Sequence, residues 1–298
     1  MLPILIICYL RPEKLESILS QLTGTSRKIY VFIDRAEGEL ANLNKRVLET
    51  ANRFASNLDI RIQFSDKNVG VAKGVPVAID WVFNFEKEII VIEDDCLPTK
   101  YAYLFFDNQY KKLNDSILMV CATSPNNYNG QKHEDSFITL SNYPLIWGWA
   151  TNKQSWFKLR NLLHTKTPHM RVLNSILKNP KRIISYSYFY AAVIRINRGE
   201  MLAWDSAIAL EMLLSNYKAI IPDITMVENS GKDMNASHFS NPSNKLDQII
   251  ISASKLESIC IFNGSENFTK ITNKKIEKNI YNFRMRNIFS PLKALLGF

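Results

Sequence analysis

The sequence is poor in the residue patterns that define metal clusters, disulfide frameworks and phosphate-binding loops. Its four cysteines lie far apart and form no C-x-x-C pair, and its four histidines form no H-E-x-x-H. A zinc enzyme and a disulfide-stapled domain are therefore disfavoured. The chain also lacks G-x-x-x-x-G-K-[ST] and a G-x-G-x-x-G after a strand, which argues against P-loop ATPases, kinases and dinucleotide dehydrogenases. We interpret the cysteines as reduced core thiols of a cytoplasmic protein.

Long apolar runs are absent as well, and no stretch approaches the roughly 18 apolar residues that a membrane-spanning helix needs. The apolar stretch 2–10 has no basic residues before it and no small-residue cleavage site, and Arg11-Pro12 ends it. These features favour a buried strand over a signal peptide. We therefore expect a soluble or peripheral protein.

The composition fits a large folded domain. The chain has 298 residues, of which 46% are hydrophobic, so it can bury a sizeable core and is not disordered as a whole. Its formal net charge is +9, which favours anionic partners such as nucleotides, nucleic acids or acidic membrane surfaces.

The first half of the chain alternates short apolar runs with amphipathic segments, which is typical of β-α-β units. The run at 89–92 is apolar throughout, as expected of a central strand. We predict an α/β fold with helices flanking a central, mostly parallel mixed sheet. The predicted strands are 3–8, 29–33, 60–64 and 89–92, the predicted helices between them are 12–22, 40–51 and 75–85, and further β-like runs are 117–121, 137–140 and 145–150.

Polar residues follow each of the first four predicted strands. Ligands of open α/β sheets bind outside the carboxyl ends of the strands, so these residues are candidates for one binding site. Lys73, at the entry of the third helix, is a further candidate for a phosphate contact, with a solvated surface charge as the alternative. The strand-end residues are Arg11, Asp34, Asp66 with its neighbours 67 and 68, and the triplet Glu93, Asp94 and Asp95.

The triplet Glu93-Asp94-Asp95 directly follows the buried fourth strand. Three adjacent carboxylates raise one another's pKa, and burial penalises their charged form, so a counter-ion is expected. Oxygen ligands favour Mg²⁺ or Mn²⁺, which proteins hold with one or two carboxylates plus substrate phosphates. The triplet thus indicates a site for a nucleoside diphosphate leaving group. The alternative is a solvated acidic turn.

These motifs together resemble a known family. The first strand with Arg11, the strand end at Asp34, the run I-I-V-I-E-D-D at 89–95, I-W-G-W at 146–149 and W-D at 204–205 are similar in order and spacing to the N-acetylglucosaminyltransferase I family of GT-A glycosyltransferases. Bacterial surface-polysaccharide transferases are more distantly similar. The resemblance covers roughly residues 1 to 240 and implies a GT-A fold.

The resemblance also implies roles for individual residues. It assigns the metal ion to Asp95, the ribose to Asp94 and the donor sugar to Glu93. Arg11 and Asp34 match positions that hold the nucleotide base and ribose. Asp205 matches the family's general base, which implies inversion at the anomeric carbon. Because this chain has W-D-S-A where the family has W-D-D-W, the resemblance is weaker there than at the donor site.

Four candidate residues have a structural alternative beside the functional one. Trp147 and Trp149 flank Gly148 and could offer apolar faces to an acceptor sugar, or could be core residues. Asp205 could be a helix N-cap instead of a base. His238 could join the metal ion or close over the diphosphate, or could be a surface histidine.

The composition changes near residue 270. We predict a single GT-A catalytic domain over 1–269, with a donor part at 1–122 and an acceptor part at 123–269, followed by a tail at 270–298. The tail holds seven Lys and Arg residues against one acid, together with regularly spaced apolar residues. Such a basic amphipathic segment can lie on an anionic membrane. The alternative is an accessory helix packed on the domain.

The sequence therefore predicts a glycosyltransferase that uses Mn²⁺ or Mg²⁺ to transfer a sugar from a nucleotide-diphosphate donor to a glycan or lipid-linked saccharide. We expect it to act in surface polysaccharide biosynthesis, in the cytoplasm or at the cytoplasmic face of the inner membrane. One alternative is a sugar-1-phosphate nucleotidyltransferase. The other is a basic nucleic-acid- or glycan-binding protein, although the acid triplet and the concentration of positive charge in the tail disfavour nucleic acid.

Overall fold

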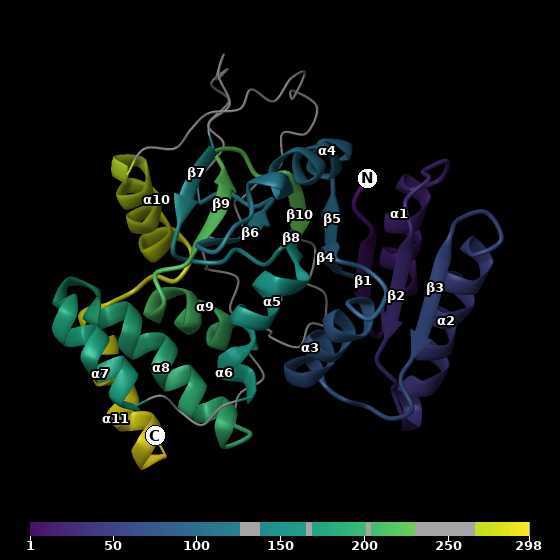
Figure 1. Ribbon diagram of the computed structural model, residues 1–298. Helices are drawn as coiled ribbons and strands as arrows, with labels where there is room; N and C mark the ends of the chain where they lie inside the picture. Colours follow the sequence, from purple (N-terminus) through teal and green to yellow (C-terminus); the bar gives the residue numbers. More distant parts are fainter. Residues whose placement is uncertain (126–137, 165–168, 201–203, 230–265, 298) are drawn as a thin grey trace.

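The computed structural model describes residues 1–125, 138–164, 169–200, 204–229 and 266–297 (Figure 1). The first half consists of strands that alternate with helices, as the hydrophobic pattern predicts. Its elements are β1 (Ile4–Cys8), α1 (Pro12–Gln21), β2 (Ile29–Ile33), α2 (Ala41–Phe54), β3 (Ile60–Phe64), α3 (Val71–Val82), β4 (Glu88–Glu93), β5 (Cys96–Pro98) and α4 (Lys100–Gln109), with short 3-10 turns η1 (Gly38–Leu40) and η2 (Tyr110–Lys112).

The second half adds the remaining strands and most of the helices. The strands are β6 (Ile117–Cys121), β7 (Ile138–Ser141), β8 (Trp149–Asn152), β9 (Lys218–Pro222) and β10 (Val227–Asn229). The helices are α5 (Lys153–Leu159), α6 (Asn161–His164), α7 (His169–Lys178), α8 (Ile183–Asn197), α9 (Trp204–Leu214), α10 (Glu266–Asn279) and α11 (Ser290–Leu296), with 3-10 turns η3 (Pro180–Arg182) and η6 (Met285–Phe289).

Eight strands form one mixed sheet in the order β3-β2-β1-β4-β8-β6-β9-β7. The first four run parallel, β8 is antiparallel to both β4 and β6, and β9 returns parallel to β6 with β7 antiparallel at the edge. A second, two-stranded sheet pairs β5 with β10. The topology confirms the predicted α/β class with a central, mostly parallel mixed sheet.

Hydrophobic side chains cover both faces of this sheet. Ile4, Ile6 and Cys8 of β1 point to one face, where α1, α2 and α4 pack, while Leu5 points to the other, where α3, α5, α8 and α9 pack. This alternation follows from the two-residue repeat of a strand. Parallel strands buried on both faces need such covering layers. The carboxyl ends of β1 to β4 are thereby held at one edge.

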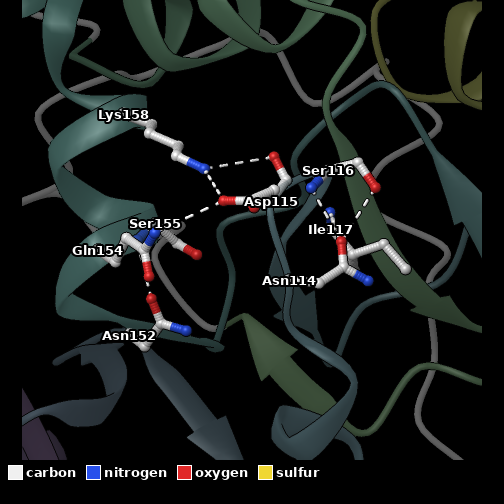
Figure 2. A network of polar contacts seen from close by, with 8 residues as sticks. All are labelled: Asn114, Asp115, Ser116, Ile117, Asn152, Gln154, Ser155 and Lys158. Carbon is white, nitrogen blue, oxygen red and sulfur yellow. Dashed lines mark hydrogen bonds and ion pairs between the residues drawn. The ribbon is translucent and has the colours of Figure 1, made fainter.

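Short-range polar contacts fix the amino end of β6 and its neighbour α5 (Figure 2). The side-chain oxygen of Asn114 accepts hydrogen bonds from the backbone N–H groups of Ser116 and Ile117 at 2.8 and 2.9 Å. Asn152 caps α5 in the same way, and Lys158 of α5 pairs with Asp115 at 2.6 Å. These contacts lie at the end of β6 opposite Cys121 and are structural.

The C-terminal segment packs against the domain, and the part up to Phe283 contributes side chains to the core. The boundary predicted at 269/270 falls inside α10, which lies along β7 (Figure 1). Ile276 is fully buried in the core, and Asn273 accepts hydrogen bonds from Ser141 Oγ and Asn142 N. Tyr281 and Phe283 continue this packing beside α8. The sequence alternative of an accessory helix describes this part of the segment.

Two observations concern the predicted class of protein. Cys8, Cys96 and Cys121 are buried free thiols, in agreement with the prediction of reduced core cysteines, while Cys260 lies outside the described residues. Among the described helices, none combines the length and the apolar character that crossing a membrane requires.

Candidate functional site

The site begins where the neighbouring parallel strands β1 and β4 end. Asp94 lies at this junction and is 5% exposed. Its carboxylate accepts from Arg11 Nη1 at 2.7 Å and from the backbone N–H of Tyr9 at 3.1 Å, and its own N–H donates to Ile7 O. The acidic triplet and the loop after β1 are therefore bound to each other through Asp94.

Asp95 is the neighbouring carboxylate and is partly exposed. One of its oxygens accepts from Cys96 Sγ at 3.2 Å, and the other lies 3.7 Å from Arg11 Nη1. Arg11 thus supplies positive charge to two members of the triplet. The counter-ion expected for the triplet was predicted to be a metal ion, and Arg11 already provides part of that charge compensation.

Burial and mutual repulsion raise the pKa of the other two acids. The pKa of Glu93 rises to about 8, mainly because the group is buried and further because Asp95, Asp94 and Asp205 lie nearby. Burial also raises the pKa of Asp94, to about 6, against the opposing effect of Arg11. At neutral pH Glu93 is largely protonated, so it can donate a hydrogen bond to a ligand as well as accept one.

The carboxylates of the triplet are candidate ligands for a metal ion. Among the described residues, no group of three or more His, Cys, Asp or Glu side chains is arranged as a metal site. Mg²⁺ and Mn²⁺ are commonly bound by one or two carboxylates plus phosphate oxygens. Asp95 fits that pattern, since its carboxylate is partly exposed, whereas Asp94 is engaged by Arg11. His238, the other predicted ligand, lies outside the described residues.

Asp34, at the end of β2, shapes the loop between β3 and α3. Its carboxylate accepts from the N–H groups of Val69 and Gly70, both at 2.8 Å, and from Ser65 Oγ at 3.1 Å. These bonds use most of the acceptor positions of a carboxylate. Asp34 therefore fixes the position of the loop between β3 and α3. Its sequence neighbours do not indicate this role. Asp66 in the loop and Lys73 on α3 are exposed.

The W-G-W segment enters β8 and is held mainly by packing. Gly148 has a φ of +73°, and a Cβ there would lie 2.7 Å from Val227 Cγ2 of β10. Trp149 is 1% exposed and packs against Trp156 and Trp204. Its ring offers no face to an acceptor in this structure and belongs to the core. Trp147 is partly exposed and packs against both core clusters.

Asp205 lies in the first turn of α9, directly after the buried Trp204. The charge of Asp205 acts on the acidic triplet, because it contributes to the raised pKa of Glu93. It also contributes to the raised pKa values of Tyr188 and Tyr281, for which burial is the main cause. The fold thus brings Asp205 and the triplet, 110 residues apart, into one electrostatic environment.

Tyr188 and Tyr281 are neighbours of Asp205 that the sequence analysis missed. Tyr188 belongs to α8, and Tyr281 follows α10 and donates a hydrogen bond to Pro144 O. Their rings pack together with a centroid distance of 6.2 Å. The only signal in the sequence was the aromatic pair Tyr281 and Phe283 in an otherwise basic segment. The C-terminal segment therefore contributes to the surroundings of the site.

Comparisons with known proteins give a weak likeness to solved structures. No family model and no curated protein matches the chain. Mouse xyloside xylosyltransferase 1 aligns with a TM-score of 0.36 and 8% identity, over 72% of this chain and 82% of its own. The 4-diphosphocytidyl-2C-methyl-D-erythritol synthase from Anaerococcus prevotii gives 0.35 and 10%, over 100% and 97%. Protein A197 from STIV gives 0.30 and 10%, over 56% and 70%.

These scores are too low to carry a functional argument. The resemblance to the N-acetylglucosaminyltransferase I family gains no support from a family match. The function must be argued from the site itself.

Proposed function

We propose that this protein is a glycosyltransferase that moves a sugar, a hexosyl or N-acetylhexosaminyl group, from a nucleotide-diphosphate donor to a hydroxyl of a glycan or lipid-linked saccharide. One observation supports this most: an acidic triplet and an arginine meet at the carboxyl ends of two central parallel strands, with Asp205 close enough to affect the pKa of Glu93. Open α/β sheets bind their ligands at this edge.

The residues divide the chemistry of such a transfer between them. The acceptor oxygen attacks the anomeric carbon, the bond from that carbon to the diphosphate oxygen breaks, and Asp205 takes the proton of the acceptor hydroxyl. Protonated Glu93 donates a hydrogen bond to a hydroxyl of the donor sugar. Attack from the face opposite the leaving group inverts the anomeric centre.

The donor's diphosphate needs positive charge as it departs. Arg11 is the described cation nearest to the triplet and can orient the nucleotide from the side of β1. Asp95 would hold Mn²⁺ or Mg²⁺, which would neutralise charge on the diphosphate as a Lewis acid. The loop that Asp34 fixes, with Asp66 and Lys73 nearby, forms the adjacent wall and is the proposed site of the nucleoside.

Thermal unfolding with ligands tests the donor site. The full chain is melted with Mn²⁺ and each of UDP, GDP, CMP and dTDP, and we expect a shift with one nucleotide, UDP in the first instance. At a hundred times the dissociation constant a ligand stabilises by about 2.7 kcal/mol. Asp95→Asn should lose the shift, whereas the exposed control Glu49→Gln should keep it. No shift with any nucleotide in the unaltered chain would exclude the proposed donor site.

The reaction products separate glycosyl transfer from the main alternative. A glycosyltransferase releases a nucleoside diphosphate, whereas a sugar-1-phosphate nucleotidyltransferase releases pyrophosphate from a nucleoside triphosphate. With a donor identified by melting, release of UDP that depends on an acceptor and is lost in Asp205→Asn would support the proposal. Release of pyrophosphate would favour the alternative.

A further inference from the structure

The C-terminal segment consists of two parts that differ in packing. Up to Phe283 most of its apolar side chains face the domain, as Ile276, Tyr281 and Phe283 illustrate, while Ile271 is exposed. Beyond Phe283 most of its large apolar side chains face outward. We call this second part the η6–α11 face; its exposed apolar members are Met285 (69% exposed), Phe289 (63%), Leu292 (57%), Leu295 (47%) and Leu296 (64%).

The backbone of this face is fixed on the domain. Ala294 is buried where α11 packs on α8. Arg198, at the end of α8, donates hydrogen bonds to the carbonyl oxygens of Ala294 and Leu295. Phe289, Leu292 and Leu296 recur at spacings of three and four residues, so they lie on one side of the helix. The apolar side chains are thus presented outward by an anchored helix.

The charged residues of the η6–α11 face itself are all basic. Arg284, Arg286 and Lys293 are exposed among the apolar residues, and no Asp or Glu follows Glu277 in the chain. Residues 136–199, which include α7 and α8, also hold ten Lys and Arg and no Asp or Glu. Two of them, Arg171 and Arg198, pair with Glu211 and Glu200. The positive excess is therefore not concentrated in the tail alone, contrary to the sequence analysis.

We propose that the η6–α11 face is an interfacial docking surface for an anionic lipid bilayer. Apolar side chains enter the boundary of headgroups and acyl chains, and the surrounding Lys and Arg residues pair with lipid phosphates. A second copy of this chain fits less well, because a symmetric contact would place Arg284, Arg286 and Lys293 of both copies together with no acid on the face to pair with them. The proposal goes beyond the proposed function and does not depend on the donor site.

The structure also shows which variants can test this idea. Removing the whole tail after Thr269 would delete Ile276 and Tyr281 from the core, so loss of binding could reflect unfolding. Substitutions of exposed residues avoid that problem. The apolar variant is Phe289→Ser/Leu292→Ser/Leu296→Ser, and the charge variant is Arg286→Gln/Lys293→Gln. The matched control is Leu40→Ser/Val77→Ser/Leu104→Ser, whose residues are 44%, 42% and 54% exposed on η1, α3 and α4.

The experiment is co-sedimentation of the full chain with vesicles of phosphatidylcholine alone or with 30% phosphatidylglycerol added. We expect binding to the anionic vesicles that weakens with salt. The apolar variant should bind at least about a hundredfold more weakly, since each buried CH₂ contributes about fourfold. The charge variant should lose about 20- to 30-fold, because each basic residue contributes about fivefold. The control variant should bind like the unaltered chain.

Each outcome decides the proposal. Melting temperatures of all variants must match, which establishes that binding and not folding has changed. Equal binding by the apolar variant and the control, or no binding of the unaltered chain to anionic vesicles, would overturn the proposal. A dimer in solution that the apolar variant dissociates, without vesicle binding, would assign the face to a second copy instead.

Discussion

At the residue scale, the main feature of the site is that the carboxyl groups of Glu93 and Asp94 lose much of their hydration at the end of β4. Their raised pKa values mean that both groups hold a proton more tightly in the folded chain than in the unfolded chain. Protonation therefore favours folding at both groups, although the ion pair with Arg11 opposes this effect at Asp94.

The stability of the protein should consequently depend on pH through Glu93. Its contribution is fully present below the unfolded pKa of about 4.5 and disappears as the pH rises through the folded value of about 8. Relative to Glu93→Gln, we expect the free energy of unfolding to fall by several kcal/mol over this range, since one pKa unit corresponds to about 1.4 kcal/mol. Urea unfolding at pH 5 to 8.5 in a chelator measures the difference. If the free energies of unfolding of the two chains change with pH in parallel, the pKa of Glu93 is not raised by folding.

The ion pair between Arg11 and Asp94 should matter more than its surface counterparts. Arg11→Met leaves a buried carboxylate without its cation, and we expect it to lower the free energy of unfolding at pH 7.5 by about 3 kcal/mol. Arg46→Met breaks an exposed pair with Glu13 of the same 2.7 Å length and should cost less than about 1 kcal/mol.

A double variant completes this comparison. Adding Asp94→Asn to Arg11→Met removes the unpaired charge and should recover part of the loss. If Arg11→Met and Arg46→Met lower the free energy of unfolding equally, burial does not strengthen the ion pair between Arg11 and Asp94.

At the element scale, close approach of β8 to β10 depends on Gly148. The same φ of +73° occurs at Gly199, where a Cβ would meet nothing within 4 Å. Gly199→Ala should therefore cost about 1 to 2 kcal/mol from backbone strain alone. Gly148→Ala should cost more, since its Cβ would also collide with Val227. Chemical unfolding of both variants measures the difference, and equal losses would mean that β10 moves aside freely.

The sequence predicts the elements of the first half closely, because they obey local rules. The predicted strands at 29–33 and 60–64 match β2 and β3, and the run at 89–92 lies within β4. Apolar strands of a buried parallel sheet are distinctive over five or six residues. The grouping of polar residues at the strand ends was predicted for the same reason.

The parts that the sequence does not predict depend on contacts between distant residues. Asp34 binds N–H groups 35 and 36 positions away, and Arg11 meets Asp94 across 83 positions. Nothing near Trp149 distinguishes a core tryptophan from a sugar-binding one. Basic residues in the tail suggested a segment that can lie on a membrane, although the buried Ile276 and the partly buried Tyr281 alternate with them.

At the scale of the whole molecule, the C-terminal segment is part of the domain that precedes it. A chain that ends at Phe283 keeps Ile276, Tyr281 and Phe283 in the core, whereas one that ends at Thr269 loses all three. We expect the longer chain to lose only the packing of η6 and α11 on α8. The shorter chain should lose several kcal/mol more, since burying one such side chain contributes about 1.5 to 3 kcal/mol. Differential scanning calorimetry of the three chains measures this order. Equal melting of the two shortened chains would show that this packing adds no stability.

The ring of Trp204 packs against Trp149 at a centroid distance of 6.3 Å, and Asp205 is the next residue. The backbone position of the proposed base, Asp205, is therefore fixed by the packing of two buried tryptophans. A change of about 1 Å in the position of a reacting group can cost about a hundredfold in rate. Evolution or design that repacks this interior would alter turnover while every residue that contacts substrate stays the same.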